Sequence, residues 1–520
     1  MTGLDIEEIQ DTRWHRLSPL TIGAGAIAVV ALIGLPALAA AVILALVGLL
    51  LWAVLTPLAA ALLSVALVGT AVLRYRRTHY RVTGERMEMR SGLLSRTHLS
   101  LPRERIRSVD LATPVWARPL GLCQVTVGTG QSSHSHSDEL KLAYVSAADG
   151  DRLRRDLLAR AAPSPQAPTA QRQARRNASP VLAEMRPAWF GYGFAAQGPA
   201  AVAYPMVVGG TASFSELLFQ WALRLYLPTG QAPGIGAVVA IVLTLAAGSV
   251  VVGAVVAMVL HIEAWSNYRL TREPDGTLRV TRGLLNLSSV SIEERRLRGV
   301  RLCTPLPLRW FGAATVAAIA SGLGQEGGKN SGLVPKRSLS PDVPREEAER
   351  IAGRALPGAA FGTLTAHPSA ALRRRLVRAG VAVVGLAGAT VALVLLTSAH
   401  SRLPEVPLWS AAVVFVLSAP IAALYAWGSY RGLGHGLSER HLYLRRGMLA
   451  RSTAVLNRDA VIGWTIRRSP LQRRAGLATI GATIAADEGV CHAVDAATGQ
   501  GLALAEEAVP GLLTPFLERD

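Results

Sequence analysis

Three arginine-rich segments offer the most distinctive chemistry in the sequence. They are RRLRGVR at 295–301, RRRLVR at 373–378 and RRSPLQRR at 467–474. Near an anionic lipid surface, each such charge contributes about 1 kcal/mol to binding. Nucleic acid would also attract arginine, but no aromatic side chains are interleaved to stack on bases, so we expect no nucleic-acid partner. The candidate lipid- or partner-binding residues are Arg295, Arg296, Arg298, Arg301, Arg467, Arg468, Arg473 and Arg474.

These basic segments have more than one interpretation. The charge at 373–378 is explained by its place beside an apolar stretch, because the cytoplasmic flanks of membrane helices collect arginine. For 295–301 and 467–474 we favour contact with a membrane surface. A protein partner and a plain solvated face are the alternatives.

Two further segments resemble catalytic or metal-binding motifs only superficially. GLGQEGGKN at 322–330 has Leu323 where a phosphate-binding loop needs glycine, and Asn330 where it needs serine or threonine, so we predict a polar hairpin loop. HSHSDE at 134–139 offers weak metal ligands, but no second ligand group supports it and we predict a solvated loop. No nucleophile motif is present. We therefore predict no enzyme activity, no cofactor and no metal.

The composition indicates a membrane protein. Half of the 520 residues are hydrophobic, few are aromatic, and the net charge is +19. No ionisable residue occurs between Leu17 and Leu73, which is long enough for a pair of membrane-spanning helices at about 20 residues each. The three cysteines, Cys123, Cys303 and Cys491, are far apart and are expected to be reduced thiols.

The apolar segments come in pairs, and each pair precedes a polar segment. The predicted spans are 22–43 and 50–73 within a hairpin at 17–73, then 189–209 and 236–260 within 189–260, then 378–399 and 407–427 within 376–427. The other predicted parts are soluble domains at 78–160, 266–357 and 433–520, a flexible linker at 161–180, and an outer interfacial helix at 213–226.

Charge next to the spans predicts their direction. Twelve arginines flank one side of the predicted hairpins, whereas the opposite loops contain only Arg224 and Arg402. Both termini and all three soluble domains are therefore expected on the cytoplasmic side of the membrane. The interiors of the predicted spans lack Asp, Glu, Lys, Arg and His, which disfavours a proton- or ion-coupled carrier.

The three span pairs and soluble domains are copies of one repeat. Each copy has a glycine, an aliphatic residue fourteen positions later, a proline at 22 or 23 and a second glycine at 29. These markers are Gly92, Ile106, Pro114 and Gly121, then Gly283, Leu297, Pro305 and Gly312, then Gly447, Val461, Pro470 and Gly476. The leads HRLSPL, AEMRPA and TAHPSA also correspond, so the repeat is a whole module of lead, two spans and domain.

Each domain has the pattern of a small antiparallel β structure. The first copy contains about six or seven short alternating strands and ends in a helix that starts at a capping-box-like Ser146 and Asp149. The shared glycines are expected at hairpin turns. The predicted fold class is a multi-pass α-helical membrane protein with three α+β domains, each an antiparallel barrel or sandwich closed by a C-terminal helix.

This pattern resembles the bacterial pleckstrin-homology-like (PH-like) domain. The residues that carry the resemblance are Tyr80, Gly92, Pro102, Ile106, Val109, Pro114, Gly121 and Leu122. Three such domains, each after two spans, resemble the YdbT-like membrane proteins. The third copy departs most, because His435 replaces the tyrosine found at Tyr80 and Tyr268.

The resemblance implies the inner membrane of a bacterium as the location, and a functional setting. It suggests a smaller membrane protein with a single PH-like domain as partner, and a role in envelope stress or in resistance to membrane-directed antibacterial peptides. The sequence predicts a non-enzymatic scaffold that binds anionic lipid headgroups or a membrane partner, with self-association left open. The alternative is a lipid or peptide exporter with regulatory cytoplasmic domains.

Overall fold

The computed structural model describes most of the chain. The described residues are 14–16, 29–46, 48–128, 139–158, 180–196, 235–321, 334–399, 407–513 and a few isolated positions, with short gaps at 84, 92–96, 103–105, 107, 115–116, 275, 363 and 487. The chain divides into two compact units. Unit 1 comprises Met1–Met185, Ile262–Glu294 and Ser321–Lys329, and unit 2 comprises Arg186–His261, Arg295–Ala320 and Asn330–Asp520.

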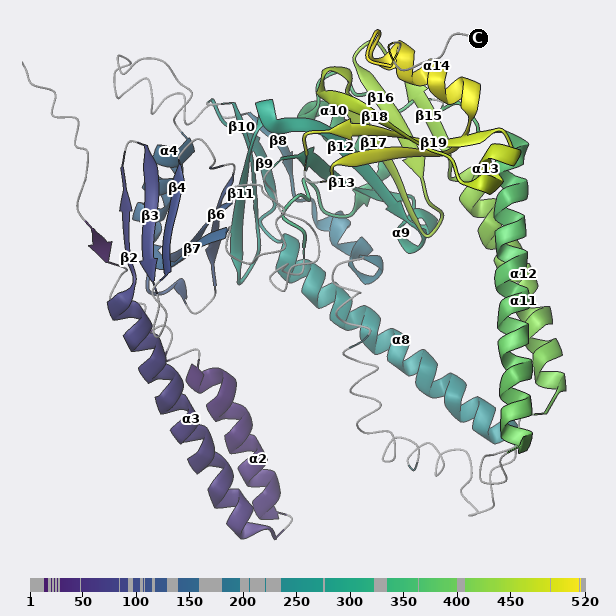
Figure 1. Cartoon of the computed structure of the whole chain (residues 1–520). Coiled ribbons are helices and arrows are strands. Elements are labelled where there is room, and N and C mark those ends of the chain that lie inside the picture. Colours follow the sequence, from purple (N-terminus) through teal and green to yellow (C-terminus); the bar gives the residue numbers. More distant parts are fainter. Residues whose placement is uncertain are drawn as a thin grey trace, which may run out of the picture. The chain divides into compact units, whose positions relative to one another are not determined.

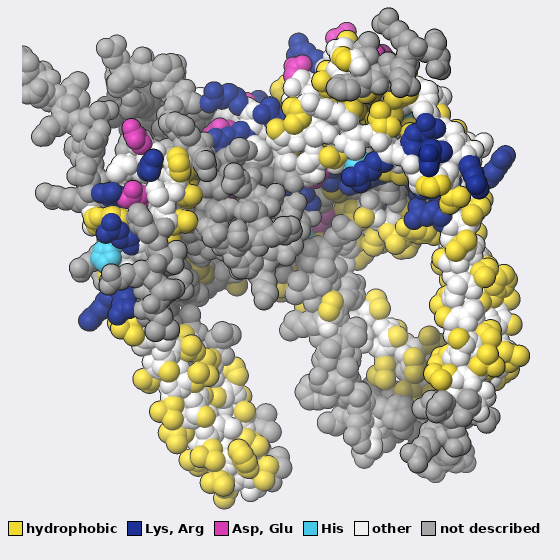
Figure 2. All heavy atoms as spheres, in the orientation of Figure 1, with side chains coloured by type: hydrophobic (Ala, Val, Ile, Leu, Met, Phe, Trp, Pro, Cys, Tyr) yellow, Lys and Arg dark blue, Asp and Glu magenta, His cyan; other side chains and the backbone are white. Residues whose placement is uncertain are grey.

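Long apolar helices confirm four of the six predicted membrane spans, those at 50–73, 236–260, 378–399 and 407–427 (Figure 1). Among the described residues, four helices are long and apolar enough to cross a bilayer: α3 (Leu50–Arg77), α8 (Ile235–Trp265), α11 (Ser369–Ala399) and α12 (Trp409–Arg431). A π-helical turn (Val30–Gly34) leads into α2 (Leu35–Leu46), which packs against α3, and α11 packs against α12. Their apolar side chains are largely exposed, as expected of surfaces that face lipid (Figure 2).

The predicted span at 189–209 does not begin as a membrane helix. Residues Pro187–Ala195 form the 3₁₀ helix η5, in which Trp189 is buried and Phe194 packs near Leu308. Pro187 fixes the start of this helix, and Gly191 and Gly193 weaken any α-helical continuation. Almost all of 197–209, of the predicted interfacial helix at 213–226 and of the predicted linker at 161–180 lies outside the described residues.

Unit 1 contains the first repeat and the first sheet of the second repeat. One sheet has the order β1-β2-β3-β4 and another the order β7-β6-β5-β11-β10-β9-β8. The elements are β1 (His15–Arg16), β2 (His79–Val82), β3 (Arg86–Ser91), β4 (Thr97–Pro102), β5 (Ser108–Thr113), β6 (Leu122–Gly128), β7 (Glu139–Ser146), α4 (Ala147–Leu158), β8 (Val181–Glu184), β9 (Arg269–Arg272), β10 (Thr277–Arg282) and β11 (Leu287–Glu293). The strands of the first repeat enclose a core that includes Met87, Val109 and Val125.

Unit 2 contains the remaining strands of the second repeat and all of the third. Its sheets have the orders β14-β13-β12-β17-β16-β15 and β18-β19-β20. The elements are η6 (Glu294–Arg296), of which only Glu294 belongs to unit 1, β12 (Leu297–Pro305), α9 (Leu306–Trp310), β13 (Ala313–Ala320), β14 (Val343–Pro344), α10 (Arg345–Ala355), β15 (Gly434–Leu437), β16 (His441–Arg446), β17 (Ala450–Asn457), β18 (Val461–Arg467), α13 (Pro470–Arg474), β19 (Leu477–Ile484), β20 (Val490–Ala497) and α14 (Thr498–Ala508). Helices α4, α10 and α14 end the three repeats.

The marker glycines have two different roles. Gly283 and Gly447 have φ of +111° and +93° and make hairpin turns, as expected, whereas Gly92 lies outside the described residues. Gly312 and Gly476 have φ of +67° and +65°, but each follows a short helix and precedes a strand, so the hairpin expectation is wrong for them. Such left-handed backbone is typical of glycine after a helix.

The lead segment of each repeat pairs with the first strand that follows its spans. His15 pairs with Tyr80, Ala183 with Leu270, and Thr365 with His435. The first two pairings are short antiparallel ladders, and the third is a single antiparallel bridge. This pairing gives the repeated leads a structural reason, because each one is joined by backbone pairing to the first strand after its spans.

Candidate functional site

In unit 1, an apolar hairpin turn lies at the end of α8. The backbone N–H of Gly283 donates to the carbonyl of Ser266 at 2.7 Å, and that of Leu284 donates to the carbonyl of Glu263 at 2.9 Å. The Glu263 carboxylate accepts from the backbone N–H of Leu285 at 2.9 Å. Leu284 and Leu285 are nevertheless exposed. These hydrogen bonds fix the turn at the end of the apolar helix and leave both leucines exposed.

In unit 2, the equivalent turn lies at the end of α12. A Cβ on Gly432 would come within 2.0 Å of the Gly447 carbonyl oxygen, and one on Gly428 within 2.9 Å of the Met448 side chain. Only glycine permits this approach of the turn to the helix. Leu449, the second residue after Gly447, is exposed.

Exposed apolar residues and arginines of unit 2 gather around this turn. Helix α9 starts beside it, since the N–H of Leu306 donates to the carbonyl of Leu449 at 2.6 Å, and Trp310 at its end is 72% exposed. Helix α13, which follows β18, packs near the ends of α11 and α12 through Ala475. We define the span-end surface as Trp310, Phe311, Leu449, Leu471 and the exposed arginines of residues 467–474 and of the adjoining ends of α11 and α12.

Four of the predicted arginines lie on the span-end surface. Arg467, Arg468, Arg473 and Arg474 are all exposed. A capping box fixes the start of the helix between them: the Ser469 hydroxyl accepts from the N–H of Gln472 at 3.3 Å, and the Gln472 side chain accepts from the N–H of Ser469 at 2.9 Å. Figure 2 shows basic side chains gathered where α13 meets the ends of α11 and α12.

The other four predicted arginines do not lie at a span end. Arg295 and Arg296 follow β11, whose seven residues run away from the turn at Gly283. Because a strand rises about 3.3 Å per residue, the length of β11 is roughly 20 Å. The Nε of Arg298 is buried. Arg301 pairs with Glu488. Lipid binding by these four residues stays a prediction.

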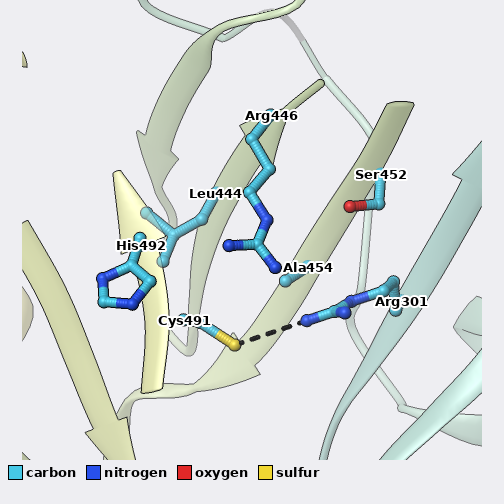
Figure 3. A pocket seen from close by; sticks show the side chains of 7 residues that line it. All are labelled: Arg301, Leu444, Arg446, Ser452, Ala454, Cys491 and His492. Atoms are coloured by element: carbon cyan, nitrogen blue, oxygen red, sulfur yellow. Dashed lines mark hydrogen bonds between the residues drawn. The ribbon is translucent and has the colours of Figure 1, made fainter. Parts of the chain in front are cut away.

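Arg301 also lines a small pocket between β12 and the third repeat (Figure 3). Its Nη2 donates to the Sγ of Cys491 at 3.7 Å, and Arg337 donates to the second carboxylate oxygen of Glu488 at 3.1 Å. Burial raises the pKa of Cys491 to about 11, so its thiol stays protonated at neutral pH. The three cysteines are free, and no cluster of three or more potential metal ligands occurs among the described residues.

A buried carboxylate that sequence reasoning missed joins the third domain to a membrane helix. Asp495 in β20 is 1% exposed and forms ion pairs with Arg374 and Arg375 at the start of α11, the second at 3.3 Å. Gln472 donates to the same carboxylate at 2.9 Å. The backbone carbonyl of Asp495 lies 3.0 Å from the Nδ1 of His367. The second repeat has Asp342 at the equivalent position, also buried and three residues before its closing helix, so the repeat contained a signal that sequence reasoning missed.

Two buried histidines extend this network. The Nε2 of His367 lies 3.1 Å from the Nδ1 of His435. Burial lowers the pKa of both imidazoles, to about 4 for His435, where the neighbouring His367 adds to the effect. The pair is therefore neutral at pH 7 and joins the lead of the third repeat to β15.

Consecutive repeats are joined by strand pairing in one register. Thr113 of β5 pairs with Leu287 of β11, and Thr304 of β12 pairs with Arg451 of β17. In each pair, the first residue directly precedes a marker proline and the second lies four residues after a marker glycine. The junction between the first two repeats and the junction between the last two therefore have the same strand register.

An arginine contact also recurs at the two junctions. Arg118 donates to the carbonyl of Leu284 at 2.9 Å, and Arg309 donates to the carbonyl of Met448 at 3.4 Å. Both arginines lie four residues after a marker proline, and both acceptors directly follow a marker glycine. The spacing of the repeat contained this signal, which sequence reasoning missed.

A comparison with protein families agrees with this architecture. The family model described as Bacterial PH domain matches residues 25–161, 223–357 and 381–504, which together make up more than half of the chain. No curated protein and no solved structure matches the chain. Three copies of this domain, combined with long apolar helices, confirm the predicted fold class and the prediction of a membrane protein.

Proposed function

The chain belongs to the bacterial PH domain family, and from this premise we propose that it is a membrane scaffold that holds its PH-like repeats at the cytoplasmic leaflet. The proposal depends above all on the span-end surface. Aromatic and aliphatic side chains are exposed there beside four arginines, at the ends of helices long enough to cross a bilayer. Apolar side chains suit the headgroup region, and arginines suit anionic lipid.

The lead strands support a common side for the repeats. The segment before each set of spans pairs with the first strand after it, which favours placing both ends of each span segment on one side of the membrane. The cytoplasmic side is favoured because arginines flank these ends, including Arg76, Arg77, Arg378 and Arg431.

Single cysteines placed in each domain should all react from the cytoplasmic side. We would introduce Glu85→Cys, Glu349→Cys and Asp459→Cys one at a time into a chain whose native cysteines are replaced by serine. An impermeant maleimide should label all three in inverted vesicles and none in intact spheroplasts. Labelling of any two sites from opposite sides would disprove the topology.

The span-end surface should respond to anionic lipid. In nanodiscs that contain phosphatidylglycerol, amide hydrogen exchange at 467–474 should be several-fold slower than in phosphatidylcholine nanodiscs. The combined change Arg467→Gln and Arg468→Gln should remove most of that difference, since each charge contributes about 1 kcal/mol. As a matched control, Arg295→Gln with Arg296→Gln should leave the difference unchanged. Equal exchange in the two lipids would reject lipid contact.

The partner and the physiological role are further parts of this proposal. A smaller membrane protein with a single PH-like domain and a role in envelope stress or antibacterial-peptide resistance follow from the family resemblance alone. Efflux of lipid or peptide from vesicles reconstituted with the purified chain would instead favour the exporter alternative.

A further inference from the structure

At each of the two junctions between repeats, a strand at the edge of one repeat pairs with a strand at the edge of the next. One edge strand of each kind has no such partner within the described part of the chain. At each junction an outer strand of one repeat (β5 or β12) pairs with the third strand of the next repeat (β11 or β17). The equivalent strands are β18 in the third repeat and β4 in the first. Within the described part of the chain, β18 pairs with β19 alone and β4 with β3 alone. Unpaired edges of this kind are ready to accept another strand.

The free edge of β18 is apolar where its counterparts are covered. Leu111 in β5 and Leu302 in β12 are 8% and 3% exposed, and both lie in strands that pair with the next repeat. The equivalent residue in β18 is Ile466, which is 39% exposed. We expect this higher exposure of Ile466 if β18 lacks a neighbouring strand like those that cover Leu111 and Leu302.

The junction arginine also has an unused equivalent. Counting from the marker proline gives Arg474, and counting back from the marker glycine gives Arg473, because the third repeat is one residue shorter between these markers. Both side chains are exposed. Arg118 and Arg309 instead donate to the turn of the following repeat.

A glycine in β18 keeps room for an incoming strand. At Gly299 in β12, a Cβ would meet the carbonyl oxygen of Val455 in the paired strand at 2.2 Å. Its counterpart in β18 is Gly463, which occupies the same irregular position in its ladder. The nearest atom to a Cβ there is 3.9 Å away, on Thr483. The chain itself therefore does not require glycine at this position.

We propose that β18 of one copy of this chain pairs with β4 of a second copy, in the register of the internal junctions. Ile466 would then lie opposite His98, as Leu302 lies opposite Thr453. Arg473 or Arg474 would then take the role that Arg118 and Arg309 have at the internal junctions. Because this contact joins two different edges, it is heterologous and extends into a row or closed ring of chains. This inference goes beyond lipid binding and does not depend on it.

Crosslinking tests the register directly. Two differently tagged full-length copies would be co-expressed, one with Ile466→Cys and the other with His98→Cys. Mild oxidation should give a disulfide-linked pair that contains both tags. Ile462→Cys, four residues away on the same strand, is the matched control with His98→Cys and should crosslink at least tenfold less. Equal crosslinking of both pairs, or none, would overturn the proposal.

A second set of variants separates docking from folding and from lipid. In phosphatidylcholine nanodiscs or detergent, which contain no anionic lipid, mass photometry should show oligomers of the parent chain. Gly463→Ala, and separately Arg473→Ala with Arg474→Ala, should weaken association at least tenfold while the melting temperature of the monomer stays the same. Arg440→Ala, on an exposed turn, should have no effect. A parent chain that remains monomeric at micromolar concentration would refute self-association and leave the lipid experiment unaffected.

Discussion

Replacing Asp495 with alanine is expected to lower the free energy of unfolding by about 3 kcal/mol or more, the usual cost of breaking a buried ion pair from one side. The carboxylate is 1% exposed and neutralises Arg374 and Arg375 at the start of α11. Alanine would leave both guanidinium groups without this acceptor, and the Gln472 amide would keep only the Thr479 hydroxyl. Thermal unfolding of the purified chain in detergent, followed by tryptophan fluorescence, measures the loss.

The effect should be greatest where the third domain meets the membrane helix. Asp495 has a φ of +60°, a backbone conformation that asparagine and aspartate tolerate better than alanine does. Asp495→Asn therefore keeps the backbone and an oxygen for Gln472 but removes the charge. It should retain part of the stability that alanine loses, and hydrogen exchange should rise at 369–375 in both variants.

An exposed aspartate of the same domain provides the control. Asp459 lies in the short helix η7 (Arg458–Ala460) and is exposed, so Asp459→Ala should change stability by less than about 0.5 kcal/mol. If Asp495→Ala behaved like Asp459→Ala, the ion pairs at the start of α11 would contribute nothing to the attachment of the third domain.

The sequence predicted those parts of the fold that depend on local pattern and repetition. Apolar length predicted the helices now seen as α3, α8, α11 and α12, and spacing located the turn glycines Gly283 and Gly447. The segment at 189–195 was predicted incorrectly because hydropathy alone does not distinguish lipid contact from burial within a domain. Trp189 is an example, because its apolar side chain is buried within a domain.

The candidate site was predictable only in part, for a related reason. Repetition indicates positions that all copies share, such as Arg118 and Arg309. It does not give Asp495 a role, although Asp342 has the equivalent position in the second repeat, because the partners of Asp495 in α11 and α13 come together only on folding. A cluster of arginines in the sequence likewise does not show where the arginines lie in the fold. Arg295 and Arg473 therefore could not be distinguished from the sequence, although only Arg473 lies at a span end.

Replacing Gly299 with alanine should have the second large effect, by disrupting the junction between the second and third repeats. The new Cβ would lie 2.2 Å from the Val455 carbonyl oxygen and 3.0 Å from the Cα of Leu456, both of which are backbone atoms that cannot rotate away. Overpacking of this kind costs about 1–3 kcal/mol. Because Gly299 faces β17 across the ladder, hydrogen exchange should increase in β12 and β17 together.

Gly463→Ala is the matched control, since it makes the same chemical change at the equivalent position of the next repeat. Its Cβ would meet nothing closer than 3.9 Å, so the melting temperature of the monomer should not change. The free energy of unfolding should therefore fall for Gly299→Ala alone. An equal loss in both variants would mean that glycine is needed for the irregular strand itself, and that pairing between repeats does not impose it. No loss in either would mean that β12 and β17 can separate at little cost, and the repeats would then act as independent domains.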